Sequence, residues 1–317
     1  MKPDIVMEAP KHSPVIIAII VIISTLLTAS CINSKSSIIY ITGPQQVTSL
    51  AETLSDEYYI LTEGRVQSIV KASNSDGAFE DLCSGKNHIT IASRPISRTE
   101  LIRCNDSSIK VVEFPIATSP IVVAVHPLNQ QNFKCLSTEE LSAFWNGHHD
   151  LELTLYKPSN NSDLFTHLDQ ILGAGESKPT SKSQSPNTMV TNLLNDINGI
   201  AYLDYATFFA GKDYLLPIGI QETPGTCYIP DHTNANSGSY TYLNQNLFFY
   251  FRHDLLKKDY LSEFATMILD ESYINIITNL GYTTLDSTVY AENRILLAER
   301  TAGSRYTEKN QNIGGIK

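Results

Sequence analysis

Three loops of this sequence combine small polar side chains with the start of a helical pattern, at residues 43–47, 73–77 and 159–163. A loop that enters a helix can hold a small anion, because the first N–H groups of the helix have no partner within it. The second loop, Ser-Asn-Ser-Asp-Gly, suits this role, although an acid such as Asp76 is unusual in an anion site. His88 is also an unusual residue to begin the strand that follows. The three loops are therefore candidates for one ligand site.

The segments around these loops alternate between strand and helix patterns, which indicates parallel α/β sheets. In such sheets ligands bind at loops beyond the carboxyl ends of the strands, and the three loops fit this position. Pro120 is expected to separate two strands, and residues 173–187 are expected to form a polar loop. Strands are predicted at residues 38–41, 109–114, 121–126, 151–156, 199–203 and 247–252, with a strand–helix–strand unit within 66–91, and helices at 47–58, 137–145, 160–172, 189–197, 261–269 and 273–280.

The length, composition and charge of the chain limit the classes of protein to which it can belong. The 317 residues are enough for two domains or one large domain, and 42% hydrophobic with 18% charged residues indicates a packed core. With 23 basic and 33 acidic residues, the net charge is −10. A nucleic-acid partner is not expected, because no basic surface is available for phosphate contacts.

The first 31 residues have the pattern of an export signal. Residues 15–29 are almost all apolar, and this run is shorter than the ~20 residues that a membrane-spanning helix needs. It ends in Ala29-Ser30-Cys31, which resembles a bacterial lipobox, so Cys31 is expected to carry a lipid as the first mature residue. An uncleaved membrane anchor is the alternative. Both place the rest of the chain outside the cytoplasmic membrane, in the cell envelope or periplasm.

The other cysteines point to disulfides. Without Cys31 the chain has Cys83, Cys104, Cys135 and Cys227, an even number that suggests two disulfides in an oxidising compartment. Four cysteines allow three pairings, and the sequence alone does not choose among them. We predict Cys83–Cys104, because the two flank one short strand–loop unit, and this leaves Cys135–Cys227 by elimination.

No signature of catalysis or metal binding stands out. The sequence has no Gly-x-Ser-x-Gly elbow and no cysteines spaced as CxxC. The best metal candidate combines His148, His149 and Asp150 with His167, but adjacent residues on one element point apart. We interpret residues 147–150 as a solvated turn, and we expect neither an enzyme nor a cofactor or metal site.

Five segments carry a family resemblance, and they read GPQQVTSLAETLSDEY, DGAFEDLCSGKNHITIASRPI, KCLSTEELSAFWNG, GSYTYLNQNLFFYF and NLGYTTLD. In this order they resemble successive landmarks of the phosphate-binding protein of bacterial phosphate ABC transporters. The second segment is the most specific, and together the five extend over roughly residues 38–286.

This resemblance implies a two-lobed α/β fold of the type II periplasmic-binding-protein kind, with a ligand cleft between the lobes. The chain of such a fold crosses between the lobes twice, and we place the crossings near residues 119–125 and 247–251. The expected domains are residues 1–31 as signal peptide and lipoprotein anchor, 37–118 with 250–317 as lobe 1, and 119–249 as lobe 2.

The resemblance also implies a phosphate site made of loop hydroxyls, backbone N–H groups and one acid that accepts a hydrogen bond from a protonated phosphate oxygen. The matching positions are Gln46, Ser75, His88 and Ser162, and only the two serines keep the usual residue type. Gln46 stands where hydroxyls are usual, His88 replaces the acid, and Asp163 replaces a glycine. A carboxylate there is unfavourable for a bound dianion, by about 4 kcal/mol at about 4 Å and an effective dielectric of about 20.

The implied function is that of an extracytoplasmic solute-binding protein of a phosphate-type ABC importer, which binds phosphate or another small anion and works with the permease of that importer. The alternative is a binding-protein-like lipoprotein that has lost transport and serves a sensory, adhesive or scaffold role. Simpler roles stay open for His88, as a half-buried strand residue, and for Ser75 and Ser162, as helix caps. With three usual contacts missing, we expect phosphate binding roughly 10³-fold or more weaker than is typical of the family.

Overall fold

The computed structural model describes residues 36–132, 134–148, 153–173, 181–223, 225–231, 234 and 239–306. The chain divides into two compact units, Met1–Ser36 and Ser37–Lys317, and the fold below is that of the second unit. The predicted export signal and the lipid site at Cys31 lie outside the described residues. Among the helices that the structure describes, none has the length and apolar character needed to cross a membrane.

A ten-stranded sheet runs through the second unit, and a small three-stranded sheet lies beside it. Strands β13 (Thr283–Thr284) and β9 (Leu216–Pro217) both pair with β4 of the large sheet. The other strands of the large sheet are, in spatial order, β2 (Val66–Ser73), β1 (Ser37–Pro44), β3 (Ile89–Ala92), β12 (Asn244–Arg252), β4 (Val111–Val125), β8 (Gly199–Asp204), β6 (Thr154–Pro158) and β7 (Ser181–Gln184); the small sheet has the order β11 (Thr226–Tyr228), β10 (Gly219–Thr223) and β5 (Cys135–Ser137).

The large sheet is mixed, whereas the sequence pattern predicted parallel sheets. β1 is parallel to β2 and β3, and β6 is parallel to β7 and β8, as the alternation of strands and helices requires. β12 is antiparallel to β3 and β4, and β4 is antiparallel to β8. The two long strands β4 and β12 therefore join two parallel groups, one at each end of the sheet.

β4 is one continuous buried strand of 15 residues, so the predicted break at Pro120 is wrong. Pro120 lies where β4 changes partners: Thr118 pairs with β13, and the pairing with β8 starts at Ile121. A missing N–H is tolerated at such a change of ladder. β4 and β12 carry the chain between the two halves of the sheet, while the lobe boundaries at residues 118/119 and 249/250 stay a prediction.

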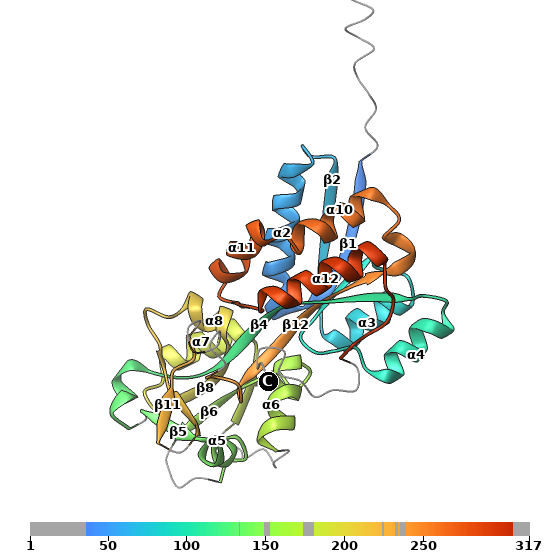
Figure 1. Cartoon of the computed structure of the whole chain (residues 1–317). Helices are drawn as coiled ribbons and strands as arrows, with labels where there is room; N and C mark the ends of the chain where they lie inside the picture. Colours follow the sequence, from blue (N-terminus) through green and yellow to red (C-terminus); the bar gives the residue numbers. More distant parts are fainter. Residues whose placement is uncertain are drawn as a thin grey trace, which may run out of the picture. The chain divides into compact units, whose positions relative to one another are not determined.

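Helices cover both faces of each half of the sheet (Figure 1). The helix α12 was not expected from the sequence, and β7 lies within the predicted loop 173–187. The α-helices are α2 (Thr48–Leu61), α3 (Ser75–Cys83), α4 (Arg98–Asp106), α5 (Thr138–Trp145), α6 (Asp163–Leu172), α7 (Pro186–Leu194), α8 (Tyr205–Ala210), α10 (Asp259–Ile268), α11 (Ile274–Asn279) and α12 (Ser287–Glu299), with 3-10 turns η1 (Gln45–Val47), η2 (Pro127–Asn132), η3 (His253–Leu255) and η4 (Glu271–Tyr273).

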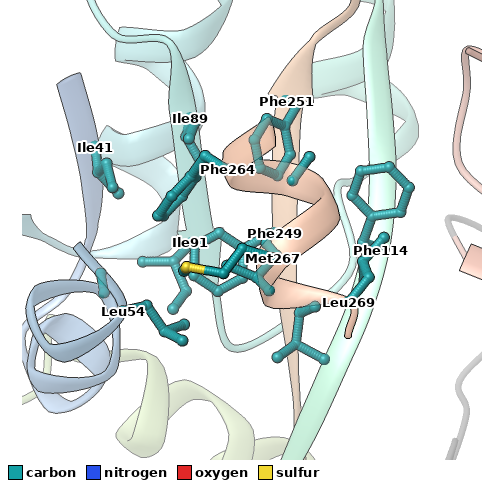
Figure 2. Packing of buried hydrophobic residues seen from close by; sticks show 14 of the residues in the cluster. Ile41, Leu54, Ile89, Ile91, Phe114, Phe249, Phe251, Phe264, Met267 and Leu269 are labelled. Atoms are coloured by element: carbon teal, nitrogen blue, oxygen red, sulfur yellow. The ribbon is translucent and has the colours of Figure 1, made fainter. Parts of the chain in front are cut away.

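Strand β12 contributes side chains to two hydrophobic cores, one on each face of the half of the sheet that contains β1, β2 and β3. Its side chains alternate between the faces of the sheet, as in any strand. Phe249 and Phe251 pack with α2 and α10 on one face, as Figure 2 shows for Phe264 and its neighbours. Phe248 and Tyr250 pack with α3 and α4 on the other face. This half of the sheet, with its helices, forms the first lobe.

The second lobe has cores of its own. α5 and α6 pack on one face of β8 and β6, around Trp145 and Tyr202. α7 and α8 pack on the other face, around Met189 and Phe208. Because each lobe buries separate apolar clusters, the surface between the lobes is left to polar loops.

Both predicted disulfides are confirmed. Cys83–Cys104 joins α3 to α4, and both of its cysteines are buried in the core of the first lobe. Cys135–Cys227 joins β5 to β11 in the small sheet, with Cys227 exposed.

Candidate functional site

The three loops singled out in the sequence line one pocket of about 350 Å³. The first loop contributes Pro44, Gln45 and Gln46 at the end of β1, and the second contributes Ser73 and Asn74 at the end of β2. The end of β6 and the third loop supply residues 158, 159 and 161–164, and residues 184–186 and Asp204 complete the wall. The pocket thus lies at the carboxyl ends of parallel strands, where α/β sheets bind ligands.

Two helix N-termini border this pocket, because the second and third loops each carry a residue that caps the helix after it. Asn74 accepts the N–H of Gly77 at 2.9 Å at the start of α3. Ser162 accepts the N–H of Phe165 at 3.2 Å at the start of α6. Capping by Asn and Ser satisfies one N–H of each helix, and the positive end of each helix dipole favours negative charge nearby.

The described residues that line the pocket are mostly polar, and none of them is basic. Amides and hydroxyls dominate, and the charged residues among them are Asp163 and Asp204. A small polar solute can therefore be held by hydrogen bonds, but a dianion would meet two carboxylates and, in this described lining, no counter-ion. Within the same part of the chain, the helix N-termini supply the electrostatic attraction for an anion.

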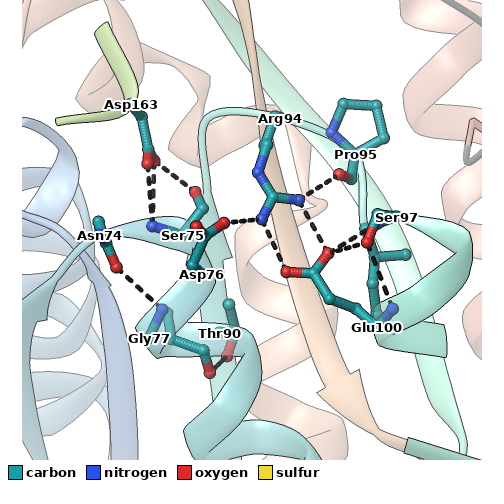
Figure 3. Close-up of polar contacts among 12 residues, drawn as sticks. Asn74, Ser75, Asp76, Gly77, Thr90, Arg94, Pro95, Ser97, Glu100 and Asp163 are labelled. Carbon is teal, nitrogen blue, oxygen red and sulfur yellow. Dashed lines mark hydrogen bonds and ion pairs between the residues drawn. The ribbon is translucent and has the colours of Figure 1, made fainter. Parts of the chain in front are cut away.

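The carboxylate of Asp163 reaches from α6 to the start of α3 (Figure 3). Its Oδ1 and Oδ2 lie 3.1 and 3.2 Å from the backbone N of Ser75, which donates to both. The hydroxyls of Ser75 and Ser93 donate to Oδ2 at 2.5 and 2.8 Å. A carboxylate thus occupies the donors that a bound anion would use in this loop.

Ser75 is accordingly fully buried and does not line the pocket, because Asp163 stands in front of it. Ser162 does line the pocket while capping α6, so its hydroxyl hydrogen is still available. Gln46 lines the pocket as well. Its carbonyl accepts the hydroxyl of Tyr282 at 2.7 Å, and its Nε2 is buried without a hydrogen-bond partner in the described part of the chain.

His88 is the exception, and its expected place in the ligand site needs correction. It lies before β3, at the amino end of the strand, whereas the pocket is at the carboxyl ends. Its ring packs edge-on against Tyr40, with 5.2 Å between the centroids. Burial, together with Lys258 and Arg252, lowers the pKa of His88 below its ordinary value. A half-buried histidine just before the strand, away from the pocket, is thus the better description.

Asp76, the acid that seemed out of place in an anion loop, points away from the pocket toward Arg94 (Figure 3). Arg94 also forms a bidentate ion pair with Glu100, at 2.9 and 2.7 Å. Glu100 completes the capping box of α4 with Ser97. This network fixes the segment after β3, and with it the position of Ser93.

A second pocket of about 310 Å³ lies on the other side of Asp163. It shares Asn74, Asn161 and Asp163 with the first pocket. Arg94 and His167 also line it. Asp163 therefore forms a partition between two polar cavities.

Asp204 is a site residue that the sequence reading missed. It is buried at the end of β8 and caps α8, where its carboxylate accepts the N–H and the hydroxyl of Thr207 at 2.9 and 2.7 Å. Burial raises the pKa of Asp204, and the hydrogen bonds from Thr207 oppose this shift. The signal in the sequence was an acid directly after an apolar strand, followed three residues later by threonine.

The structure tests the predicted absence of a metal site only for the residues that it describes. Among the residues that the structure describes, no group of three His, Cys, Asp or Glu side chains is placed to hold a metal ion. His149 and Asp150 of the weak candidate lie outside the described residues, and His167 lies in α6, beside the second pocket.

Comparison with known proteins agrees with this fold. A family model described as PBP superfamily domain matches residues 33–272. Protein SphX of Synechocystis is 28% identical over 296 residues, with 87% of each chain covered. The phosphate-binding protein PstS of Staphylococcus haemolyticus is 26% identical, covering 72% of this chain and 75% of its own. The solved structure of an ABC-type phosphate transport receptor from Vibrio cholerae superposes with a TM-score of 0.61 at 16% identity, over 78% of this chain and 99% of its own.

Proposed function

The chain belongs to the family of PBP superfamily domains, and from this membership we propose that it is an extracytoplasmic solute-binding protein of a phosphate-type ABC importer. Members of this kind bind a solute and hand it to a permease, and they are not enzymes. On this proposal the chain itself has no catalytic residues and no cofactor. Its partners are phosphate or another small anion and the permease of the same importer.

The observation that carries the proposal is the meeting of the three loops at one pocket. Two of the helices that start there, α3 and α6, belong to different lobes, because Phe79 and Leu82 of α3 and Leu164 and Leu168 of α6 are buried in separate cores. A solute at this place touches both lobes and favours their closed arrangement. Binding that couples to lobe closure is what a carrier needs, since a permease can then distinguish loaded from empty protein.

The ligand would be held by hydrogen bonds and helix N-termini. Gln46 offers a buried amide group without a partner, and Ser162 offers a hydroxyl hydrogen. Asp204 can accept a hydrogen bond from a protonated oxygen of the ligand, which would favour a partly protonated anion over sulfate. His88, which the resemblance matched to the acid, takes no part in this arrangement.

The proposal places the chain at the cell envelope or periplasm, attached to a membrane by a lipid at Cys31. The support is the lipobox-like Ala29-Ser30-Cys31 after an apolar run, together with two disulfides, which persist in oxidising compartments. Replacing Cys31 with Ser should release the protein from the membrane fraction or leave its signal uncleaved. Unchanged membrane retention with an unchanged mature mass would refute the lipid anchor.

One observation favours the second candidate, a binding-protein-like lipoprotein with a sensory, adhesive or scaffold role. Asp163 already fills the donors of Ser75 and Ser93, and no cation is among the pocket-lining residues that the structure describes. A chain that no longer captures phosphate would tolerate these features. Phosphate binding separates the two candidates.

Isothermal titration of the purified chain with phosphate, followed by sulfate, arsenate and uncharged phosphate esters, tests the proposal. We expect measurable but weak phosphate binding, with a dissociation constant well above the micromolar range. Sulfate should bind more weakly than phosphate. Absence of heat and of thermal stabilisation with every anion, at millimolar concentrations, would leave the non-transport candidate as the better account.

A further inference from the structure

The carboxylate of Asp163 lies between the N-termini of two helices, α3 and α6, that belong to different lobes. Asp163 is the first residue of α6, so its carboxylate lies at the positive end of its own helix. The same carboxylate accepts the first N–H of α3, from Ser75. The carboxylate thus lies at the N-terminus of α6 and accepts a hydrogen bond from the N-terminus of α3, which is a position that a bound anion could take.

We propose that Asp163 is a built-in anion that latches the two lobes together in the absence of solute, and that any diffusing anion must displace it to bind at Ser75 and Ser93. This inference rests on the proposed function, because it names the group that controls access to the proposed site. It assigns Asp163 as the residue that sets both the affinity of the site for anions and the resting state of the lobes.

The contact has the strength that a latch needs. The carboxylate accepts one N–H and two hydroxyls, and hydrogen bonds with an ionised partner are stronger than neutral ones. Ser75 and Ser93 are both almost fully buried, so water competes poorly for these donors. A second interlobe bond lies beside it, from the amide Nδ2 of Asn74 to the carbonyl of Asn161 at 3.3 Å.

Tethering gives Asp163 an advantage over a free anion. Because the side chain is fixed on α6, its effective concentration at α3 is in the mM range or higher when the lobes are near each other. A solute at micromolar concentration must therefore outcompete a local ligand that is present in large excess. The latch weakens anion binding even before direct repulsion between the two negative charges is considered.

The position of the latch also explains why two cavities flank it. Both cavities include Asn74 and Asn161, and Asp163 separates them. Removing its carboxylate joins the space in front of Ser162 to the space in front of Arg94. The opened cavity would hold free donors from both lobes, together with the nearest guanidinium group.

The test compares the wild-type chain with Asp163→Ala and Asp163→Asn. The Asn variant keeps the volume and removes the charge, so it remains informative if the Ala variant folds poorly. Asp213→Asn is the control, because it also removes one negative charge and Asp213 is exposed at a distance from the pocket lining. Spin labels on noncanonical amino acids at Glu80 of α3 and Gln170 of α6 report the distance between the lobes, since both side chains are exposed and border the same surface hollow.

For the full chain in detergent, we expect Asp163→Ala to give a longer and broader label distance without ligand, which returns toward the wild-type distance when inorganic phosphate is added. Titration calorimetry should show at least about tenfold tighter phosphate binding than in the wild type, with Asp163→Asn between the two. The wild type and Asp213→Asn should show the short distance with or without phosphate.

Two results overturn the latch: an unchanged label distance in Asp163→Ala and Asp163→Asn, or measurable phosphate binding by both variants with the same affinity as the wild type. The proposed function fails separately. If Asp163→Ala opens the lobes but no variant binds any anion, the latch stands and the importer role falls. If every variant binds phosphate equally without a change in distance, the importer role stands and the latch falls.

Discussion

The backbone N–H of Ser75 donates to both oxygens of the Asp163 carboxylate, across 88 positions of sequence and from one lobe to the other. Through this contact a carboxylate of the protein itself binds at the loop 73–77. It also separates the two acids near the loop: Asp163 takes the place of an anion, whereas Asp76 pairs with Arg94 outside the pocket. The donors of Ser75 are therefore satisfied by a side chain of the protein itself, a property that composition alone does not reveal.

Replacing Ser75 with Ala should lower the free energy of unfolding by about 1–3 kcal/mol. The hydroxyl of Ser75 donates to Asp163 and accepts the buried N–H of Ser93 at 3.3 Å, so its loss leaves a buried donor without an acceptor. Urea unfolding followed by circular dichroism measures the change, with the exposed Ser107→Ala as control. A loss of under about 0.5 kcal/mol would show that the contact contributes little.

Changing His88 to Ala or Asp should leave phosphate affinity within about twofold of the wild type at both pH 6 and pH 8. His88 does not line the pocket, and burial lowers its pKa below the ordinary value, which disfavours the charged ring. Calorimetric titration of both variants measures this. Phosphate binding that strengthens on acidification in the wild type, but not in His88→Ala, would place the histidine in the site after all.

Much of the fold could be predicted because the local pattern and the final packing agree. The unit within residues 66–91 folds as β2, α3 and β3, since its apolar residues alternate as the elements require. The helix α12 was missed because its buried residues, such as Tyr290 and Leu297, do not form a strong apolar stripe. β7 was missed because its sequence, Ser-Lys-Ser-Gln, is polar and its strand is defined by pairing with β6.

Protonation of one histidine, His167, should lower the free energy of unfolding by about 2 kcal/mol between pH 7 and pH 5. Burial lowers the pKa of His167 to about 4, from an ordinary value of 6.5, while a backbone hydrogen bond with Asn244 opposes the shift. Between these two pKa values the unfolded chain binds the proton and the folded chain does not. The stabilisation is therefore complete above pH 6.5 and lost as the pH falls toward 4.

Denaturation of the wild type and of His167→Gln at pH 7 and pH 5 measures this contribution as the difference between the two chains. Other titrating groups, such as Asp204 with its raised pKa, are present in both chains and cancel to first order. An equal pH dependence in the two chains would show that His167 is not held neutral by the fold.

Mild reduction should open the two disulfides in a defined order. Cys135–Cys227 has one exposed cysteine, whereas both cysteines of Cys83–Cys104 are buried, so a reductant reaches the former first. Loss of Cys135–Cys227 should also lower the free energy of unfolding more than loss of Cys83–Cys104, because Cys135–Cys227 closes the longer loop. The chain-entropy model gives about 4–5 kcal/mol for Cys135–Cys227 and about 3 kcal/mol for Cys83–Cys104. Alkylation and peptide mapping at increasing dithiothreitol concentrations give the order. Earlier labelling of Cys83 or Cys104 would contradict it.

The site could be predicted only in outline. The loops at residues 43–47, 73–77 and 159–163 were recognisable because polar residues preceding a helix have a local signature. The pairing of Asp163 with Ser75 is not local: it depends on how closely the two lobes approach, and the sequence pattern carries no record of that distance. His88 was misplaced because a matched position in a strand does not fix which end of the strand faces the cleft.

A crystal structure of Asp163→Ala grown with phosphate, beside wild type grown in the same phosphate concentration, tests the central claim most directly. The account predicts a phosphate in the variant with oxygens about 3 Å from the Ser75 backbone N and the hydroxyls of Ser75 and Ser93, and the Asp163 carboxylate at those donors in the wild type. Phosphate bound elsewhere in the variant, or bound at Ser75 in the wild type with Asp163 turned away, would contradict it.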